Sequence, residues 1–373
     1  MQQYPTTAAS FPPPGLRRRR AAATRAGHGG GGSTSVPATA ARPQRLLLLA
    51  VMALTAAFGQ GPRLALANVN VTWNDVATMP FATGETSAGL LWGAKKEPLL
   101  VVMGWNPNDT NASAATMVLD INASKWSVRA QRPFVSHHMA AVTAFNKLYL
   151  IGGYLQRSQY NMQIYEPIKN TWTVGPPPLV QSGAASATVI NNTIYHCGGV
   201  DKGNTINGLP ITTCAKFHIP SGKWSYIAPM PHAVHHAAMA NDGKLVYVFG
   251  GRNSTAGTGI NPVNYTQIYN PANNTWISNT QQGGPAAVPV GRGGMGTAVY
   301  YKGHFYLIGG EVRYNPVTNT WDKGLPGMSL ARHGAYPVVG PAPNSTAPVV
   351  YVCAGGIKQS FSENTLCTYM TVP

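Results

Sequence analysis

Basic and aromatic residues recur at two places in a repeated stretch of this 373-residue sequence. One set precedes a short apolar segment and comprises Arg132, His137, His235, Arg292, Arg332 and His333. The other set follows glycine and comprises Trp105, Tyr154, Arg252 and Glu311. The arginine fork suits carboxylate, sulfate or phosphate groups, and aromatic faces suit sugar rings or peptide side chains. We therefore predict a basic site for a protein or an acidic glycan. The alternative is that these arginines serve packing within the repeat.

Two histidine groups, His137-His138 and His232-x-x-His235-His236, raise the question of a metal ion. Adjacent residues of a strand point to opposite faces, so each adjacent pair offers only one imidazole to a common ion. We therefore expect these histidines to pack or to contact a ligand. Neither a metal ion nor another cofactor is expected.

Acid–base catalysis is the competing chemistry. The acidic residues are dispersed, and Glu85, Glu166 and Glu311 are each expected to be solvated loop residues. An enzyme would need Glu85 or Glu311 to meet an imidazole such as His137 or His333. Residues 291–296 fit a dinucleotide fingerprint, but they precede a strand pattern instead of opening a helix. The sequence contains no nucleophile elbow, zinc-binding helix or P-loop.

The elements that must position these residues come from a repeat of about 50 residues. In each unit an apolar stretch ends in glycine, as in residues 148–153 and 305–310, and has no polar alternation. Such a stretch predicts a strand that is covered on both faces. Units of a few short strands cannot bury both faces alone, so they must stack radially around an axis. Six tryptophans mark the units at intervals of 53, 46, 52, 52 and 45 residues: Trp73, Trp126, Trp172, Trp224, Trp276 and Trp321.

This pattern resembles the kelch-repeat family over residues 68–373. The resemblance implies an all-β, six-bladed β-propeller, with the tryptophans packed between neighbouring blades. The last unit stops without its fourth strand, and Trp73 has no unit before it. We therefore expect residues 68–78 to complete the sixth blade and close the ring. A content of 41 Gly and 30 Pro with 10% charged residues also favours short strands and turns.

The resemblance also bears on function. Binding sites of propellers form at one end of the central channel, from loops of successive blades. Some kelch-like propellers resemble carbohydrate epimerases or lyases, so a carbohydrate-active enzyme is the alternative function. The copper-radical oxidases of the family need a cysteine crosslinked to a tyrosine, and this chain has no cysteine to spare. No BTB domain of the kind found in cytosolic kelch adaptors is expected.

Four cysteines occupy matching positions in two units. Cys197 and Cys353 precede glycine pairs, and Cys214 and Cys367 lie in the strands that follow. Pairing of adjacent strands predicts two disulfides within blades, 197–214 and 353–367, out of three possible connectivities. An even number of cysteines agrees with an exported protein.

The N-terminal 67 residues resemble a targeting segment. An arginine-rich stretch leads to an apolar run at residues 46–58 and then to Ala65-Leu66-Ala67, which predicts cleavage after Ala67. The 13-residue run is short for a membrane span, although a signal-anchored type II membrane protein is the alternative. Nine Asn-x-Ser/Thr sequons indicate a glycosylated, secreted or lumenal protein. They are Asn70, Asn108, Asn111, Asn122, Asn191, Asn253, Asn264, Asn273 and Asn344.

The formal charge of +16 does not indicate nucleic acid binding. Residues 1–67 contribute eight arginines and no acidic residue, and the remainder carries 19 basic against 11 acidic residues. No dense basic run occurs after residue 67, so no nucleic acid partner is expected. We expect a monomer.

Overall fold

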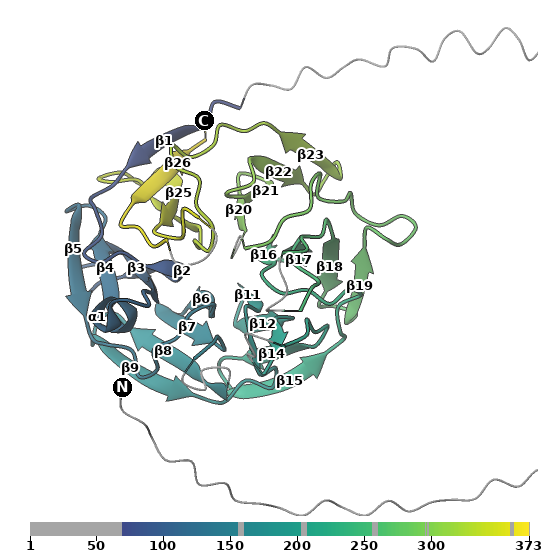
Figure 1. Ribbon diagram of the computed structural model, residues 1–373, viewed down its shortest axis with the longest axis horizontal. Helices are drawn as coiled ribbons and strands as arrows, with labels where there is room; N and C mark the ends of the chain where they lie inside the picture. Colours follow the sequence, from purple (N-terminus) through teal and green to yellow (C-terminus); the bar gives the residue numbers. More distant parts are fainter. Residues whose placement is uncertain are drawn as a thin grey trace, which may run out of the picture. The chain divides into compact units, whose positions relative to one another are not determined.

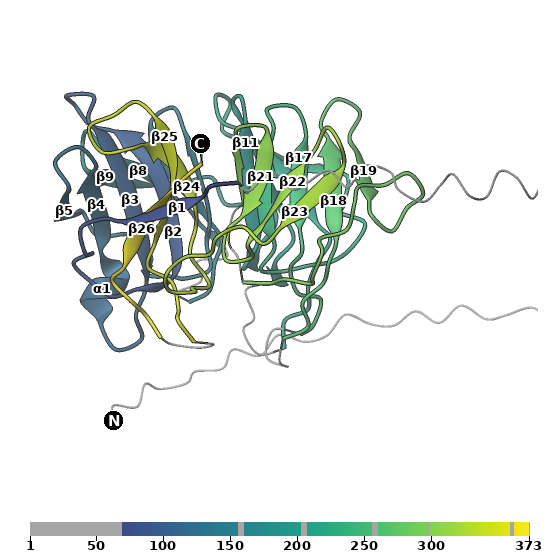
Figure 2. The same ribbon diagram turned by 90° about the horizontal axis from the view of Figure 1, so that it is seen from above.

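The computed structural model describes residues 69–155, 160–202, 207–255, 260–294, 296, 298–358 and 362–372. The predicted targeting segment, with its apolar run and cleavage site, lies outside the described residues. Within the described part, six antiparallel sheets of four strands surround a central channel (Figure 1). The loops gather at two ends of the ring when the blades are seen from the side (Figure 2). The predicted six-bladed propeller is confirmed.

The strands follow the same order in each blade, from the channel outward. Blades 1 to 3 are β2 (Gly84–Trp92), β3 (Pro98–Trp105), β4 (Thr116–Asp120), β5 (Lys125–Arg129); β6 (Ala140–Ala144), β7 (Lys147–Ile151), β8 (Met162–Glu166), β9 (Thr171–Gly175); and β11 (Ser186–Ile190), β12 (Thr193–Cys197), β14 (Cys214–His218), β15 (Lys223–Ile227). Blades 4 and 5 are β16 (Ala238–Asn241), β17 (Val246–Phe249), β18 (Thr266–Asn270), β19 (Thr275–Ser278); and β20 (Val299–Tyr301), β21 (His304–Leu307), β22 (Val312–Asn315), β23 (Thr320–Lys323). Blade 6 is β24 (Val338–Pro341), β25 (Pro348–Cys353), β26 (Cys367–Thr371), β1 (Thr72–Asp75). Loops carry the short α1 (Thr110–Ala114) and the two-stranded pair β10 (Ser182–Gly183) and β13 (Val200–Asp201).

The ring is closed by strands from both ends of the described chain. Strand β1 pairs antiparallel with β26, with Trp73 opposite Met370, and so completes blade 6. The inner strand of each blade contacts the inner strand of the next, including β24 against β2. Closure by residues 68–78 is therefore confirmed for the described Thr72–Asp75. Without β1, the edge of β26 would lack a hydrogen-bonded partner strand.

The six repeated tryptophans join neighbouring blades. Each indole N–H donates a hydrogen bond to a carbonyl that follows the outermost strand of the preceding blade. The acceptors are the carbonyls of Pro326 for Trp73 (2.9 Å), Ala77 for Trp126 (2.7 Å), Ala130 for Trp172 (3.1 Å), Pro176 for Trp224 (3.2 Å), Ala228 for Trp276 (2.8 Å) and Ala286 for Trp321 (3.1 Å). The predicted interblade packing is confirmed, and one hydrogen bond at each junction accompanies it.

Substitution of Trp276 by Phe tests this contact. Phenylalanine keeps an aromatic ring but leaves the Ala228 carbonyl without its donor, so we expect the free energy of unfolding to fall by about 1–2 kcal/mol. Urea unfolding followed by circular dichroism measures the change. Trp92→Phe is the control, because the Trp92 side chain is 45% exposed at the end of β2 and should tolerate the substitution. Equal stability of the two variants would show that the interblade bond contributes nothing.

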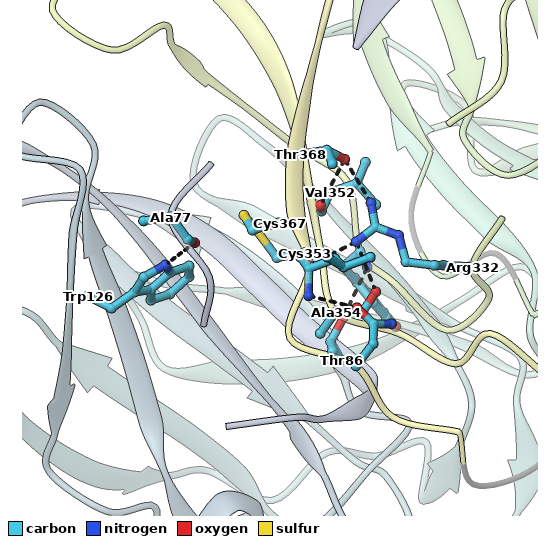
Figure 3. Close-up of a disulfide and its surroundings, with 12 residues drawn as sticks. Ala77, Thr86, Trp126, Arg332, Val352, Cys353, Ala354, Cys367 and Thr368 are labelled. Carbon is cyan, nitrogen blue, oxygen red and sulfur yellow. Dashed lines mark hydrogen bonds between the residues drawn. A yellow bond between two sulfur atoms is a disulfide. The ribbon is translucent and has the colours of Figure 1, made fainter. Parts of the chain in front are cut away.

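Both predicted disulfides are present. Cys197 and Cys214 face each other across β12 and β14, and Cys353 and Cys367 face each other across β25 and β26 (Figure 3). Two disulfides fit an extracellular or lumenal compartment. Within the ranges that the structure describes, no helix is long and apolar enough to cross a membrane.

Candidate functional site

Six residues with left-handed backbone, one from each blade, line the channel where the inner strands begin. They form the channel ring, and their φ values lie between 45° and 87°: Glu85, His138, Ala184, His236, Gly294 and Gly334. Four ring residues each donate a backbone N–H hydrogen bond, of 2.7–3.1 Å, to the carbonyl of the ring residue before them: Ala184, His236, Gly294 and Gly334. Thr86 N–H continues this belt to the Gly334 carbonyl at 2.7 Å. Consecutive blades are therefore joined at the same level of the channel.

Three ring positions carry large side chains where glycine would be unstrained. Blades 5 and 6 use glycine, whereas blades 1, 2 and 4 place Glu85, His138 and His236 in the left-handed region. This backbone costs a non-glycine residue about 1 kcal/mol or more, and such residues cluster at functional sites. Gly334 makes room for Glu85, because a Cβ at that position would lie 2.5 Å from a Glu85 carboxylate oxygen.

The Glu85 carboxylate bridges two histidines from the flanking blades. The pairing of β2 with β3 shifts register between Gly84 and Ser87, and this irregularity re-aims Glu85 toward the channel. Its Oε2 lies 3.1 Å from His138 Nε2, and its Oε1 lies 3.4 Å from His333 Nε2. The Glu85 side chain is 23% exposed, so the expectation of a solvated loop residue is wrong.

The charges of this group follow from burial and pairing. Burial favours the neutral acid, but the facing His138 and His333 outweigh it and lower the pKa of Glu85 to about 2. The hydrogen bond to Glu85 raises the pKa of His333. Glu85 is thus an anion over the physiological range, and His333 is the imidazole that best holds a matching proton.

The other histidines form two contacting pairs. Nδ1 of His137 contacts Nδ1 of His138, and Nδ1 of His235 contacts Nδ1 of His236. The expectation that each pair points to opposite faces is wrong, because His138 and His236 have positive φ and lie outside the strands. Among the residues the structure describes, no three His, Cys, Asp or Glu side chains are placed to hold a metal ion.

Burial keeps these paired imidazoles neutral. It lowers the pKa of His137 to about 3 and that of His235 to about 4, and it lowers the pKa values of His138 and His236 as well. A neutral imidazole has one N–H and one acceptor nitrogen, so one histidine of each pair donates to the other. The rings of His138 and His236 also meet at 4.8 Å, which joins the two pairs across the channel.

The channel ring leaves very little space. It encloses a cavity of about 20 Å³, lined by the six ring residues with Ala185, Ala237, Gly296 and Tyr336. A cavity of this size holds about one water molecule. A sugar or a peptide must therefore lie outside the channel ring. It would lie at the end of the propeller where the loops before the inner strands meet the loops between the second and third strands of the blades. This end is called the mouth below.

Comparison with known proteins decides the family. The family model described as the KLHDC2/KLHL20/DRC7 Kelch-repeats domain matches residues 91–310, more than half of the chain. The chain belongs to the kelch-repeat family. Kelch domains generally bind proteins, so this kelch propeller indicates a protein-interaction module.

The similar proteins are distant. Human Kelch-like protein 38 is 24% identical over 186 residues, which are 48% of this chain and 31% of that protein. Kelch-like protein terF of Aspergillus terreus is 23% identical over 296 residues, which are 72% of this chain and 61% of that protein. The chain thus spans about a third of the length of the first curated relatives that it matches. The solved structure of YjhT has a TM-score of 0.58 at 16% identity, covers 80% of this chain and 99% of YjhT, and supports the fold alone.

The kelch propeller brings the two predicted sets of residues together at the mouth. Short bridges pair His137 with Tyr154, His235 with Arg252, and His333 with Gly356, so in blades 2, 4 and 6 the loop before the inner strand meets the loop that begins at the glycine pair. Trp105 stacks on His137 with ring centroids 4.5 Å apart. Glu311 is exposed, and Glu166 lies near Lys147 and Lys169 at 3.6 and 3.5 Å.

Two of the predicted arginines are occupied internally. Arg132 is buried and donates to the carbonyls of Ser136 (3.1 Å), Gly104 (2.9 Å) and Ser113. Arg332 is buried and donates to the Leu366 carbonyl at 2.8 Å and to Thr368 Oγ1 at 2.7 Å (Figure 3). These contacts support the packing alternative for both residues.

Arg252 and Arg292 differ from them. Both are half-buried, and neither guanidinium has a hydrogen bond to any residue that the structure describes. Glycines leave them room: a Cβ on Gly293 would lie 2.5 Å from Arg252 Cγ, and one on Gly310 would lie 2.8 Å from Arg292 Nη1. They are the arginines of the predicted set that remain able to meet a ligand.

Proposed function

We propose that this chain is an extracellular or lumenal kelch propeller that binds a partner protein through an acidic group held by Arg252 and Arg292. The observation that carries the proposal is the absence of hydrogen bonds from these two guanidinium groups to described residues, at a mouth where Arg132 and Arg332 are occupied. A planar guanidinium binds a carboxylate through two parallel N–H groups. The one-water cavity behind the mouth favours a ligand that lies across the surface.

The compartment is supported by the sequons as well as by the disulfides. All nine sequon asparagines are exposed, whereas only six of the fifteen other described asparagines are. Greater exposure of the asparagines that a glycosylating enzyme can use favours a protein that is glycosylated. The proposal includes cleavage after Ala67, and N-terminal sequencing with the intact mass of the secreted product tests cleavage and glycosylation together.

The binding test removes both arginines. Purified protein is applied to an array of acidic peptides and to an array of sialylated and sulfated glycans. We expect salt-sensitive binding to acidic peptides that falls at least ten-fold in Arg252→Ala/Arg292→Ala, because each charge-assisted hydrogen bond contributes about 1.5–3 kcal/mol. Lys216→Ala/Lys223→Ala removes the same charge from exposed positions of blade 3 and should bind normally. Unchanged binding by the arginine variant would refute the site, and binding confined to the glycan array would make the ligand an acidic glycan.

A carbohydrate-active enzyme is the second candidate, favoured by one observation. Glu85 meets two imidazoles at 3.1 and 3.4 Å, the kind of carboxylate–imidazole group that moves protons. The test is nuclear magnetic resonance of reducing sugars and uronic acids incubated with the protein. Catalysed exchange or isomerisation that disappears in Glu85→Gln would favour the enzyme.

A further inference from the structure

A second recess lies at the opposite end of the propeller from the mouth, at the junction of blades 1 and 6. Its volume is about 780 Å³, within the range of ligand sites. Its apolar lining comes from the C-terminal half of β2, the start of β3, strand β24 and the start of β25. The seam groove is defined by Leu90, Trp92, Pro98, Val339, Pro341 and Pro348.

Two sequon asparagines, one from each of the two blades, line the seam groove. Asn122 lies in the turn between β4 and β5 of blade 1, and Asn344 lies in the turn between β24 and β25 of blade 6. The backbone N–H of Asn344 donates to Asn122 Oδ1 at 3.0 Å, so this bond crosses the junction. The same bond fixes the plane of the Asn122 amide while leaving its Nδ2, the atom that carries an N-linked glycan, without a partner among the described residues.

The lining suits a sugar. Trp92 presents 45% of its surface, and three prolines extend the apolar wall around it. Aromatic faces pack against the C–H faces of sugar rings, and the hydroxyl groups of Ser345 and Thr346 with the Lys96 ammonium offer hydrogen bonds at the rim. Covalent attachment beside the groove makes even a weak sugar contact intramolecular, so its effective concentration is high.

We propose that the N-linked glycan on Asn122 lies in the seam groove, with its first sugars packed on Trp92. The glycan then bridges blade 1 and blade 6, whose inner strands β2 and β24 contact each other. The inference concerns the glycan on Asn122, whose amide the Asn344 backbone N–H holds, and not a glycan on Asn344. The inference rests on the proposed secretory compartment, but it is independent of the arginines at the mouth.

Enzymatic release of glycans from the folded protein tests this inference. The protein is produced in a glycosylating secretory host and treated with peptide N-glycosidase without denaturation, and release at each site is followed by glycopeptide mass spectrometry. We expect release at Asn122 to be roughly ten-fold slower than at Asn191, which is exposed in the turn between β11 and β12. Trp92→Ala should bring the two rates within about two-fold of each other, and Trp92→Phe should give an intermediate rate.

The controls separate this inference from the proposed function. Tyr226→Ala removes an exposed aromatic side chain outside the groove and should leave the slow release at Asn122 unchanged. The inference is overturned if Asn122 carries no glycan, if its glycan is released as fast as the glycan on Asn191, or if its release rate does not change in Trp92→Ala. Slow release at Asn344 instead of Asn122 also overturns it. If none of the nine sequons is occupied, the proposed compartment fails as well. If the Trp92→Ala protein releases the Asn122 glycan faster but still binds acidic peptides, the seam groove and the mouth are separate sites.

Discussion

Glu85→Gln is expected to lower the free energy of unfolding at pH 7 by about 3 kcal/mol. Glutamine keeps the shape of the side chain but removes the charge that faces His138 and His333. His333 then loses the partner that raises its pKa, and removal of one partner of a largely buried pair is costly. Urea unfolding measures the loss. Glu166→Gln is the control, since Glu166 pairs only with two well-exposed lysines and should change stability by less than about 1 kcal/mol.

The same variant has a defined pH dependence. The pKa of Glu85 in the folded protein, about 2, lies below its ordinary value of 4.5, so its stabilisation is present above pH 4.5 and is lost as the pH falls toward 2. His333 has a raised pKa, so its contribution is complete below pH 6.5 and is lost as the pH rises through the folded value. The difference between wild type and Glu85→Gln should therefore be largest between about pH 5 and 6.5. Equal stability of the two proteins there would show that the carboxylate does not hold the ring.

The fold could be predicted from the sequence because burial dictates its pattern. A strand covered on both faces has to be apolar, and a tryptophan that joins two blades has to recur once per blade, so Trp126 and Trp172 mark the period wherever the loops differ in length. The disulfides followed from the same register, since Cys197 and Cys353 stand at one position of the repeat and face their partners in the next strand. These features stand at fixed positions of the repeated unit, so the sequence displays them directly.

The site was predicted only in part, because it depends on contacts between units. Arg132 and Arg292 belong to the same predicted set, and only the folded chain shows that Arg132 reaches the carbonyls of Gly104 and Ser113. His138 and His236 were read as strand residues, whereas their left-handed backbone turns both rings toward the channel. Alignment of the six units with one another would have revealed these residues. Glu85, His138 and His236 occupy the position of the repeat that Gly294 and Gly334 occupy in blades 5 and 6.

The paired histidines should make the propeller sensitive to acid. In the folded protein the pKa of His137 is about 3 and that of His235 about 4, both below the ordinary value of 6.5, so the unfolded chain takes up protons first as the pH falls. Stability is then lost progressively from pH 6.5 down to the folded pKa values. The depression at His235 alone corresponds to roughly 3 kcal/mol. We expect wild type to lose several kcal/mol of unfolding free energy between pH 7 and pH 4.

Glycine at the two ring histidines should reduce this loss. His138→Gly/His236→Gly gives blades 2 and 4 the residue that blades 5 and 6 already have at the ring, and it removes the imidazoles that His137 and His235 contact. Glycine relieves the strain of the left-handed backbone, which offsets part of the stability lost with the imidazole contacts. The free energy of unfolding should therefore change little at pH 7 and should be higher than that of wild type at pH 4. Ala184→Gly makes the same backbone change in blade 3 without removing an imidazole, and its pH profile should match that of wild type. A double variant that remains as acid-sensitive as Ala184→Gly would show that the proton uptake does not depend on the ring histidines His138 and His236.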